Sequence, residues 1–256
     1  NDITASGLKL NAAIGVGVLG ASVNAIETTV ITLSARATSA GINVLEATDL
    51  IVGDVTVTVQ DVAANANSTN LDGVAQSDVN TSAGNGAIVL RTTAGSITLS
   101  DGTSATNNVA GSAISAFGSG NILLNAGTAG SIVSNAGADI SSSSGDLSIV
   151  AANAITLSSG ADIRTGDATT PATVGTLDLR ALGGNVDLSS SSNLTAASGD
   201  IRVWGKVDVN LGQLISTTGN VAVYADTGSI LDNDSTDAND ITASGLKLNA
   251  AIGVGV

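Results

Sequence analysis

The chain has 256 residues, a formal net charge of −14 at pH 7, 8 Lys and Arg residues together, and no Cys or His. So few cations exclude a nucleic-acid partner held by phosphate contacts, and the absence of Cys excludes a disulfide framework and a thiolate metal site. The chain has one Phe, one Trp, one Tyr and one Pro, and its aliphatic residues are interleaved with Ser, Thr, Asn and Gly. This composition favours many short strands joined by tight turns.

The chain begins and ends with the same sequence. NDITASGLKLNAAIGVGV occupies residues 1–18 and recurs unchanged at residues 239–256, so the period, from Asn1 to Asn239, is 238 residues. Repetition at a fixed period is typical of a tandem array. We therefore expect a single continuous β-solenoid segment over residues 1–256, made of one 238-residue repeat (1–238) and the first 18 residues of the next copy (239–256).

A shorter pattern recurs inside this period. Each unit opens with an aliphatic-polar-aliphatic segment, such as LKLNA at Leu8 or IRVWG at Ile201, which is the alternation of a strand with one buried face. Most units then carry a second strand, such as GNVDL at 184–188, and a shorter third one, such as ADI at 138–140. The expected first strands start at Leu8, Ile31, Val55, Ile88, Ile122, Leu147, Leu177, Ile201 and Val221, and Leu246 starts the next unit.

Three strands and three bends in a unit of about 20 residues predict one triangular coil of a parallel β-helix, with about nine coils in each 238-residue repeat. Units commonly close with Ser-Gly-Asp or a relative, as at 144–146 and 198–200, where we expect Gly to supply the positive φ of a tight turn. The longer units are expected to carry surface loops at 63–85, 101–111, 165–175 and 233–239.

These motifs resemble a known family. The succession xLxLxA, GxIxL and AxIxxxSGD, together with DITASGLKLNAAIGVGV and INVLEATDLIVGDVTVTV, is similar in style to the repeat regions of large bacterial exoproteins of the filamentous-haemagglutinin type. The similarity extends over essentially the whole chain. It implies a right-handed parallel β-helix rod, an extracellular or cell-surface location, and a role in adhesion, aggregation or biofilm matrix.

A candidate metal site lies in the most acidic stretch of the chain. Asp232, Asp234, Asp237 and Asp240 alternate with other oxygen-bearing residues, and Ca²⁺ prefers six to eight oxygen ligands. The stretch lacks the Gly and the terminal Glu of an EF-hand loop, so a solvated loop is the competing interpretation. We expect no other cofactor: the GxGxxG match at 15–20 has neither the helix nor the acidic residue that a dinucleotide site needs.

A candidate lateral interface lies on the outer side of the first strands. Arg180, Trp204 and Tyr224 occupy the same position in successive units and are expected to stack as a ladder. The full set of expected interface residues is Lys9, Arg91, Arg180, Arg202, Trp204 and Tyr224. Such a face could contact another filament or a cell-surface glycan, and a local cover for the outer wall of the rod is the alternative interpretation.

The third strands suggest an acidic column. Asp139, Asp162, Asn193, Gln213 and Asp240 each precede an inward aliphatic residue, so they are expected to stack on the outside of the rod. Some parallel β-helices cleave polysaccharides, and Asp139 with Asp162 is the pair that such an enzyme would use. With no His or Cys and no aromatic platform beside this pair, we expect no enzymatic activity.

The main functional expectation is a structural repeat of an extracellular bacterial fibre or adhesin stalk. Its partners would be further copies of itself, joined end to end through Ile3, Leu8, Leu10, Ile241, Leu246 and Leu248. A glycan-binding or surface-binding adhesin module that uses Arg180, Trp204 and Tyr224 is the first alternative, and a polysaccharide-processing enzyme is the second. No apolar run of about 18 residues exists, so no transmembrane segment is expected.

Overall fold

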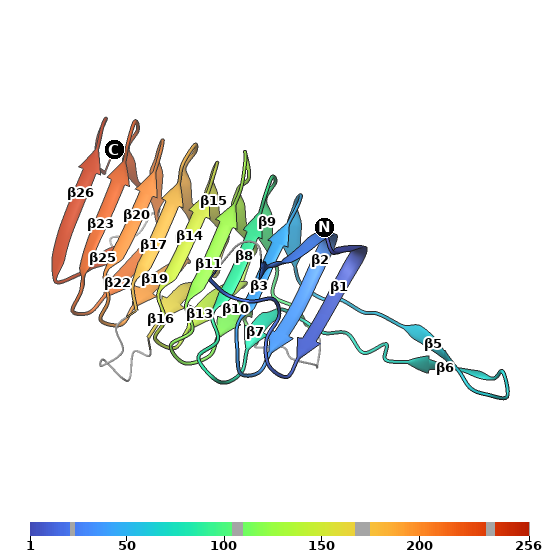
Figure 1. Cartoon of the computed structure of the whole chain (residues 1–256). Helices are drawn as coiled ribbons and strands as arrows, with labels where there is room; N and C mark the ends of the chain where they lie inside the picture. Colours follow the sequence, from blue (N-terminus) through green and yellow to red (C-terminus); the bar gives the residue numbers. More distant parts are fainter. Residues whose placement is uncertain (21–23, 104–109, 167–174, 234–238, 256) are drawn as a thin grey trace.

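The computed structural model describes residues 1–20, 24–103, 110–166, 175–233 and 239–255. Its strands coil around one axis into a rod, with successive coils side by side (Figure 1). Every pairing in the 24-stranded sheet is parallel, so the predicted all-β parallel β-helix is confirmed. Within the described ranges, no helix has the length and apolar character needed to cross a membrane.

Three columns of strands run along the rod. The first column contains β3 (Ile42–Glu46), β8 (Ile88–Thr92), β11 (Ile122–Ala126), β14 (Leu147–Ala151), β17 (Leu177–Ala181), β20 (Ile201–Gly205), β23 (Asn220–Ala225) and β26 (Gly245–Ala250). The second contains β4 (Leu50–Val52), β9 (Ile97–Leu99), β12 (Ile132–Ser134), β15 (Ile155–Leu157), β18 (Val186–Leu188), β21 (Val209–Leu211) and β24 (Ile230–Asp232). The third contains β7 (Val79–Thr81), β10 (Ser112–Ala116), β13 (Asp139–Ser142), β16 (Ile163–Thr165), β19 (Asn193–Ala196), β22 (Gln213–Ser216) and β25 (Ile241–Thr242). The coils predicted to start at Ile88, Ile122, Leu147, Leu177, Ile201, Val221 and Leu246 are therefore confirmed.

The core is a set of aliphatic stacks. In the first column Leu90, Leu124, Ile149, Leu179 and Val203 are aligned in register, and each is 0% exposed. Burying one such side chain stabilises the fold by about 1.5–3 kcal/mol. Because each stack is filled by residues from neighbouring coils, no coil can bury its own inner face alone. The alternation in the sequence therefore predicts the core of the rod directly.

The two coils at the amino-terminal end differ from the prediction. β1 (Ile3–Ala12) and β2 (Ile26–Ala37) are long strands, and β2 pairs in succession with β3, β4 and β7. Ile31 does not start a coil: it is 59% exposed at a bend, whereas Val30 and Leu33 are buried. The bend shifts the inward alternation by one residue, which a pattern read from Ile31 does not reveal. The nine coils before β26 are β1, β2, β3–β4–β7, β8–β9–β10, β11–β12–β13, β14–β15–β16, β17–β18–β19, β20–β21–β22 and β23–β24–β25. Their predicted number is therefore right, although the starts predicted at Leu8, Ile31 and Val55 are wrong.

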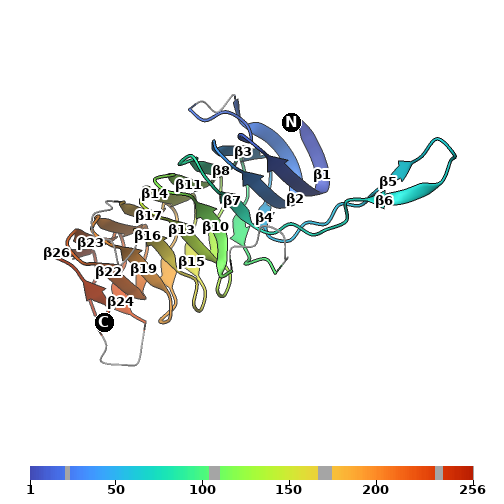
Figure 2. The ribbon, with the colours of Figure 1, turned by 90° about the horizontal axis from the view of Figure 1, so that it is seen from below.

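The coil predicted to start at Val55 is replaced by a projecting arm, which we define as residues 55–76. Val55 and Gln76 pair at its base, and beyond them β5 (Val59–Val62) and β6 (Ser68–Leu71) form the antiparallel hairpin of the structure. The arm extends past β1, away from the body of the rod (Figures 1 and 2). The predicted surface excursion at 63–85 is thus confirmed only in part, because Val79–Thr81 returns to the third column as β7.

Identical sequences occupy different columns at the two ends of the rod. Leu10 lies at one end of the third column, which passes through Ala35, Val79, Ile114, Ile140, Ile163, Leu194 and Leu214 and ends at Ile241, the repeat of Ile3. Leu246, the repeat of Leu8, lies in the first column beside Val221. The expectation that both copies run from a third strand into a first strand therefore holds for residues 241–250 and is wrong for residues 3–12.

Candidate functional site

The outer side of the first column carries the predicted ladder. Arg180 pairs in register with Trp204, and Trp204 pairs with Tyr224, as the alignment of units predicts. The next residue along the column is Asn249 of β26. These four side chains therefore lie one strand apart in succession, at the strand spacing of about 4.8 Å. The ladder contains two of the three aromatic residues of the chain.

Charge is organised around these aromatics. The Arg202 side chain donates two hydrogen bonds to the Asp178 carboxylate, at 2.8 and 2.6 Å, and this contact raises the pKa of the Arg202 guanidinium. Nε of Arg180 lies 3.4 Å from the same carboxylate. The Asp178 carboxylate thus contacts two guanidinium groups, those of Arg180 and Arg202. These three side chains together carry a net positive charge, although the chain as a whole is strongly acidic.

A third cation joins the ladder at its end. Nζ of Lys247, on β26, lies 5.2 Å from the centre of the Tyr224 ring. Beside it Trp204, Tyr224, Ala225, Asp226, Asn249 and Ala251 line a hollow of about 260 Å³. We call Arg180, Arg202, Trp204, Tyr224 and Lys247 the aromatic-basic face. The cation of this cation–π contact, Lys247, is the repeat of the predicted Lys9.

Two predicted interface residues lie elsewhere. Lys9 is at the opposite end of the rod on β1, where its Nζ contacts the Asp72 carboxylate at 2.7 Å and lowers the pKa of that carboxyl. Arg91 shares the outward column with Arg180, but Asn125 and Val150 separate them, and its Nη2 donates to Oδ1 of Asn43 at 3.1 Å. Lys9 and Arg91 therefore lie apart from the ladder, and their part in a lateral interface stays a prediction.

The acidic column on the third strands is also present, but it is not a stack of free carboxylates. Oδ1 of Asp139 accepts the backbone N–H of Asp162 at 2.9 Å, and Oδ1 of Asp162 accepts the backbone N–H of Asn193 at 2.8 Å. The Arg164 guanidinium binds the Asp139 carboxylate directly and lies 4.0 Å from Asp162. Repulsion between carboxylates one coil apart is thus offset by Arg164, a residue on the outside of β16 that the sequence pattern does not single out.

Asp139 provides a pH-dependent test of this arrangement. It is 7% exposed, and burial is the main cause that raises the pKa of its carboxyl above 3.8. A raised folded pKa means that protonation stabilises the fold at low pH, and that this stability is lost as pH rises through the folded pKa. We therefore expect the stability of the wild type, measured against Asp139→Asn by urea unfolding, to fall as pH rises from below 3.8 toward neutrality.

The control for this measurement is Asp61→Asn, at an exposed position of the arm. Its stability difference from the wild type should show no comparable decline over the same pH range. A flat difference curve for Asp139→Asn would contradict the assignment of a raised pKa to this carboxyl.

The predicted calcium site lies partly outside the described residues. Asp234 and Asp237 belong to 234–238, which the structure does not describe, whereas Asp232 ends β24 and Asp240 precedes β25. Among the described residues, no group of three or more acidic side chains has the geometry of a metal site. Calcium binding by Asp232, Asp234, Asp237 and Asp240 stays a prediction.

The predicted end-to-end residues lie at the two open ends of the rod. Ile3, Leu8 and Leu10 on β1, and Ile241 and Leu248 near the other end, are partly buried and pack against the core, whereas Leu246 is 52% exposed. Each of these strands has its neighbour on one side only, β2 for β1 and β23 for β26. The structure thus leaves one backbone edge open at each end of the rod.

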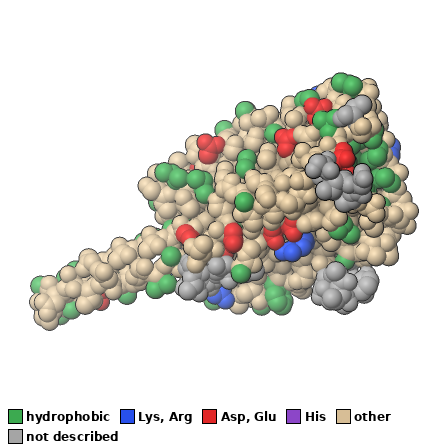
Figure 3. All heavy atoms as spheres, turned by 180° about the vertical axis from the view of Figure 1, so that it is seen from behind, with side chains coloured by type: hydrophobic (Ala, Val, Ile, Leu, Met, Phe, Trp, Pro, Cys, Tyr) green, Lys and Arg blue, Asp and Glu red, His purple; other side chains and the backbone are tan. Residues whose placement is uncertain are grey.

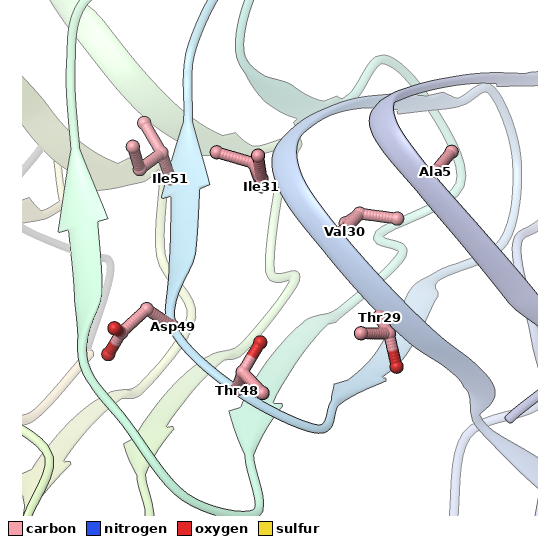
Figure 4. A pocket seen from close by; sticks show the side chains of 7 residues that line it. All are labelled: Ala5, Thr29, Val30, Ile31, Thr48, Asp49 and Ile51. Atoms are coloured by element: carbon pink, nitrogen blue, oxygen red, sulfur yellow. The ribbon is translucent and has the colours of Figure 1, made fainter.

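A further hollow lies near β1. Ala5, Thr29, Val30, Ile31, Thr48, Asp49 and Ile51 line a space of about 390 Å³, with the two Ile side chains near its upper edge and the Thr48 and Asp49 side chains below (Figure 4). Oδ1 of Asp49 accepts the backbone N–H of Ser96 at 2.7 Å. The lining offers one titratable side chain, so it has no pair of groups for acid–base chemistry.

Comparison with protein-family models, with curated proteins and with solved structures finds no match for this chain.

Proposed function

We propose that this chain is a structural repeat of an extracellular bacterial fibre or adhesin stalk, in which copies continue end to end into a long β-helix rod. One observation carries the proposal: residues 1–18 and 239–256 have the same sequence, and they form the two open ends of one parallel β-helix. Unpaired strand edges are templates for further strands. A copy that ends with the sequence with which it begins supplies such a strand.

The two ends together define a junction. β26 shows how the shared sequence pairs with the coil before it, through Leu246 beside Val221, and β1 shows how it pairs with the coil after it, through Leu8 beside Leu33. In a continuous array one segment holds both sets of hydrogen bonds. The proposed role is mechanical, because backbone ladders and aliphatic stacks then carry load along the whole rod.

A two-copy chain tests this function. Residues 1–256 followed directly by residues 19–256 should form one rod, because 239–256 then serve as residues 1–18 of the second copy. Nine coils at about 4.8 Å each predict an axial advance of about 43 Å for the added copy. Small-angle X-ray scattering and electron microscopy measure this length. Two beads joined by a flexible connection would reject the proposal.

A second candidate function rests on the aromatic-basic face. The hollow beside Trp204 and Tyr224 combines aromatic surface with Asn249 and Asp226, and an aromatic ring beside hydrogen-bonding side chains is suited to one sugar ring. On this proposal the chain is an adhesin module for cell-surface glycans. Glycan-array binding that is lost in Trp204→Ser with Tyr224→Ser, with the fold intact by circular dichroism, would support it; no binding by the wild type would reject it.

A further inference from the structure

We propose that the arm is a clamp that docks onto the aromatic-basic face of the preceding copy in the rod. The inference rests on the proposed end-to-end assembly and names a second contact within it. The arm reaches past β1 on the side away from β2 (Figure 1), and Figure 3 shows a narrow projection from the body of the molecule, seen from behind. In an end-to-end rod that side is occupied by the last coils of the preceding copy.

The repeated lysine, Lys9 at one end and Lys247 at the other, determines where the arm would lie on the preceding copy. At the amino-terminal end Nζ of Lys9 contacts the Asp72 carboxylate of the arm at 2.7 Å and donates to the carbonyl oxygen of Val74 at 3.0 Å. At the other end the repeat of this residue, Lys247, lies over the Tyr224 ring. In a continuous array the two are one residue. The base of the arm and the Tyr224 ring then share one lysine, so the arm begins beside the aromatic-basic face.

The arm has the length to cover that face. From Asp72 at the lysine, the four residues of β6 extend about 13 Å at about 3.3 Å per residue. Tyr224 and Trp204 lie on the two strands that precede β26, at about 4.8 Å and about 10 Å from it. The hairpin therefore passes over both aromatic side chains before it reaches its turn.

The chemistry of the two surfaces is complementary. Val59 and Leu71 are a cross-strand pair of the hairpin and are 51% and 57% exposed, and Val57, just before β5, is 39% exposed. A two-stranded hairpin with such exposed residues is marginally stable by itself in water. Its charged side chains, Asp61 and Asp72, are acidic, whereas the aromatic-basic face carries Arg180, Arg202 and Lys247. Docking would bury the apolar side of the hairpin against Trp204 and Tyr224 and place its acids among cations.

Trp204 is the sole tryptophan in the sequence, so its fluorescence reports the docking directly. In the two-copy chain with Trp204→Phe in the second copy, only Trp204 of the first copy emits. We expect its emission to shift to shorter wavelength, and its quenching by acrylamide to be at least halved, relative to the 256-residue chain. Val59→Ser with Leu71→Ser in the second copy should restore the quenching.

The matched control is Val62→Ser in the second copy, on the opposite side of the same hairpin, which should leave Trp204 protected. Scattering from the same samples separates the two proposals. A continuous double-length rod in which Trp204 is quenched as strongly as in the 256-residue chain would overturn the clamp and leave the fibre standing. Two separate beads would overturn the fibre itself, and the clamp with it.

Discussion

Replacing Gly199 with Ala is expected to lower the free energy of unfolding by about 3 kcal/mol, a large loss for one methyl group. A Cβ on Gly199 would lie 1.8 Å from the carbonyl oxygen of Gly175 in the preceding coil. That atom belongs to the backbone, so it cannot rotate away as a side chain would. The two coils would have to separate locally, which weakens the hydrogen bonds on both sides of the bend.

The same contact recurs along the rod, which is why the effect should be large. A Cβ on Gly145 would meet the Gly120 carbonyl oxygen at 2.1 Å, and one on Gly219 would meet the Gly199 carbonyl oxygen at 2.3 Å. The hydroxyl of Ser216 donates to the Gly199 carbonyl oxygen at 2.7 Å and accepts the Gly219 N–H at 3.0 Å. These glycines thus form a closely packed column between the third and first strands.

Gly53→Ala is the matched control. Gly53 is also buried, its φ is not positive, and its added Cβ would meet nothing closer than Cβ of Ser100 at 3.9 Å. Its free energy of unfolding should change by less than about 1 kcal/mol. Urea unfolding followed by circular dichroism measures both variants. Equal stability of Gly199→Ala and Gly53→Ala would show that the spacing of the coils at this bend is not what selects glycine.

This column shows how much the sequence reveals about the bends. The Ser-Gly-Asp motifs locate the bends correctly, but the expected reason for glycine is wrong, because Gly145, Gly199 and Gly219 do not have positive φ. Glycine is required there because the backbone of the preceding coil passes too close for a Cβ atom. The sequence pattern within one unit does not reveal this contact between coils. The interior strands were predictable for the opposite reason, since a buried stack of Leu or Ile is visible as alternation inside each unit.

The sequence likewise predicts one part of the candidate site and misses another. The alignment of units is sufficient to place Arg180, Trp204 and Tyr224 in one ladder, because the register between neighbouring coils is constant there. It fails for Lys9, because the bends in β1 and β2 change the column that each residue joins. The arm escapes prediction because VTVTV at Val55 has the alternation of a core strand, whereas its Val57 and Val59 are exposed on the way into a hairpin.

The second large effect on stability is expected at Glu46, a position that the aliphatic-polar alternation of the sequence does not identify. It ends β3 at an inward position, where the same column continues with Thr92 of the next coil. Its side chain is 0% exposed. Charged groups are rarely buried so completely unless hydrogen bonds compensate the lost hydration.

The surrounding coils supply those hydrogen bonds. Oε2 of Glu46 accepts the Thr28 hydroxyl at 2.6 Å and the Val30 N–H at 2.9 Å, and Oε1 accepts the Thr48 N–H and hydroxyl at 3.1 Å each. The carboxylate therefore joins β2 to the bend between β3 and β4. It accepts hydrogen bonds from the Thr28 hydroxyl and the Val30 N–H, which would otherwise be buried without an acceptor.

We expect Glu46→Ala to lower the free energy of unfolding by about 3–5 kcal/mol, because it leaves two buried donors, the Thr28 hydroxyl and the Val30 N–H, without their acceptor and opens a cavity. Glu46→Gln keeps the shape but replaces one acceptor by a donor, so its loss should be smaller. Glu27→Ala removes the other glutamate of the chain, which is partly exposed, and should cost less than about 1 kcal/mol. If Glu46→Ala unfolds no more readily than Glu27→Ala, the Glu46 carboxylate does not hold the first coils of the rod together.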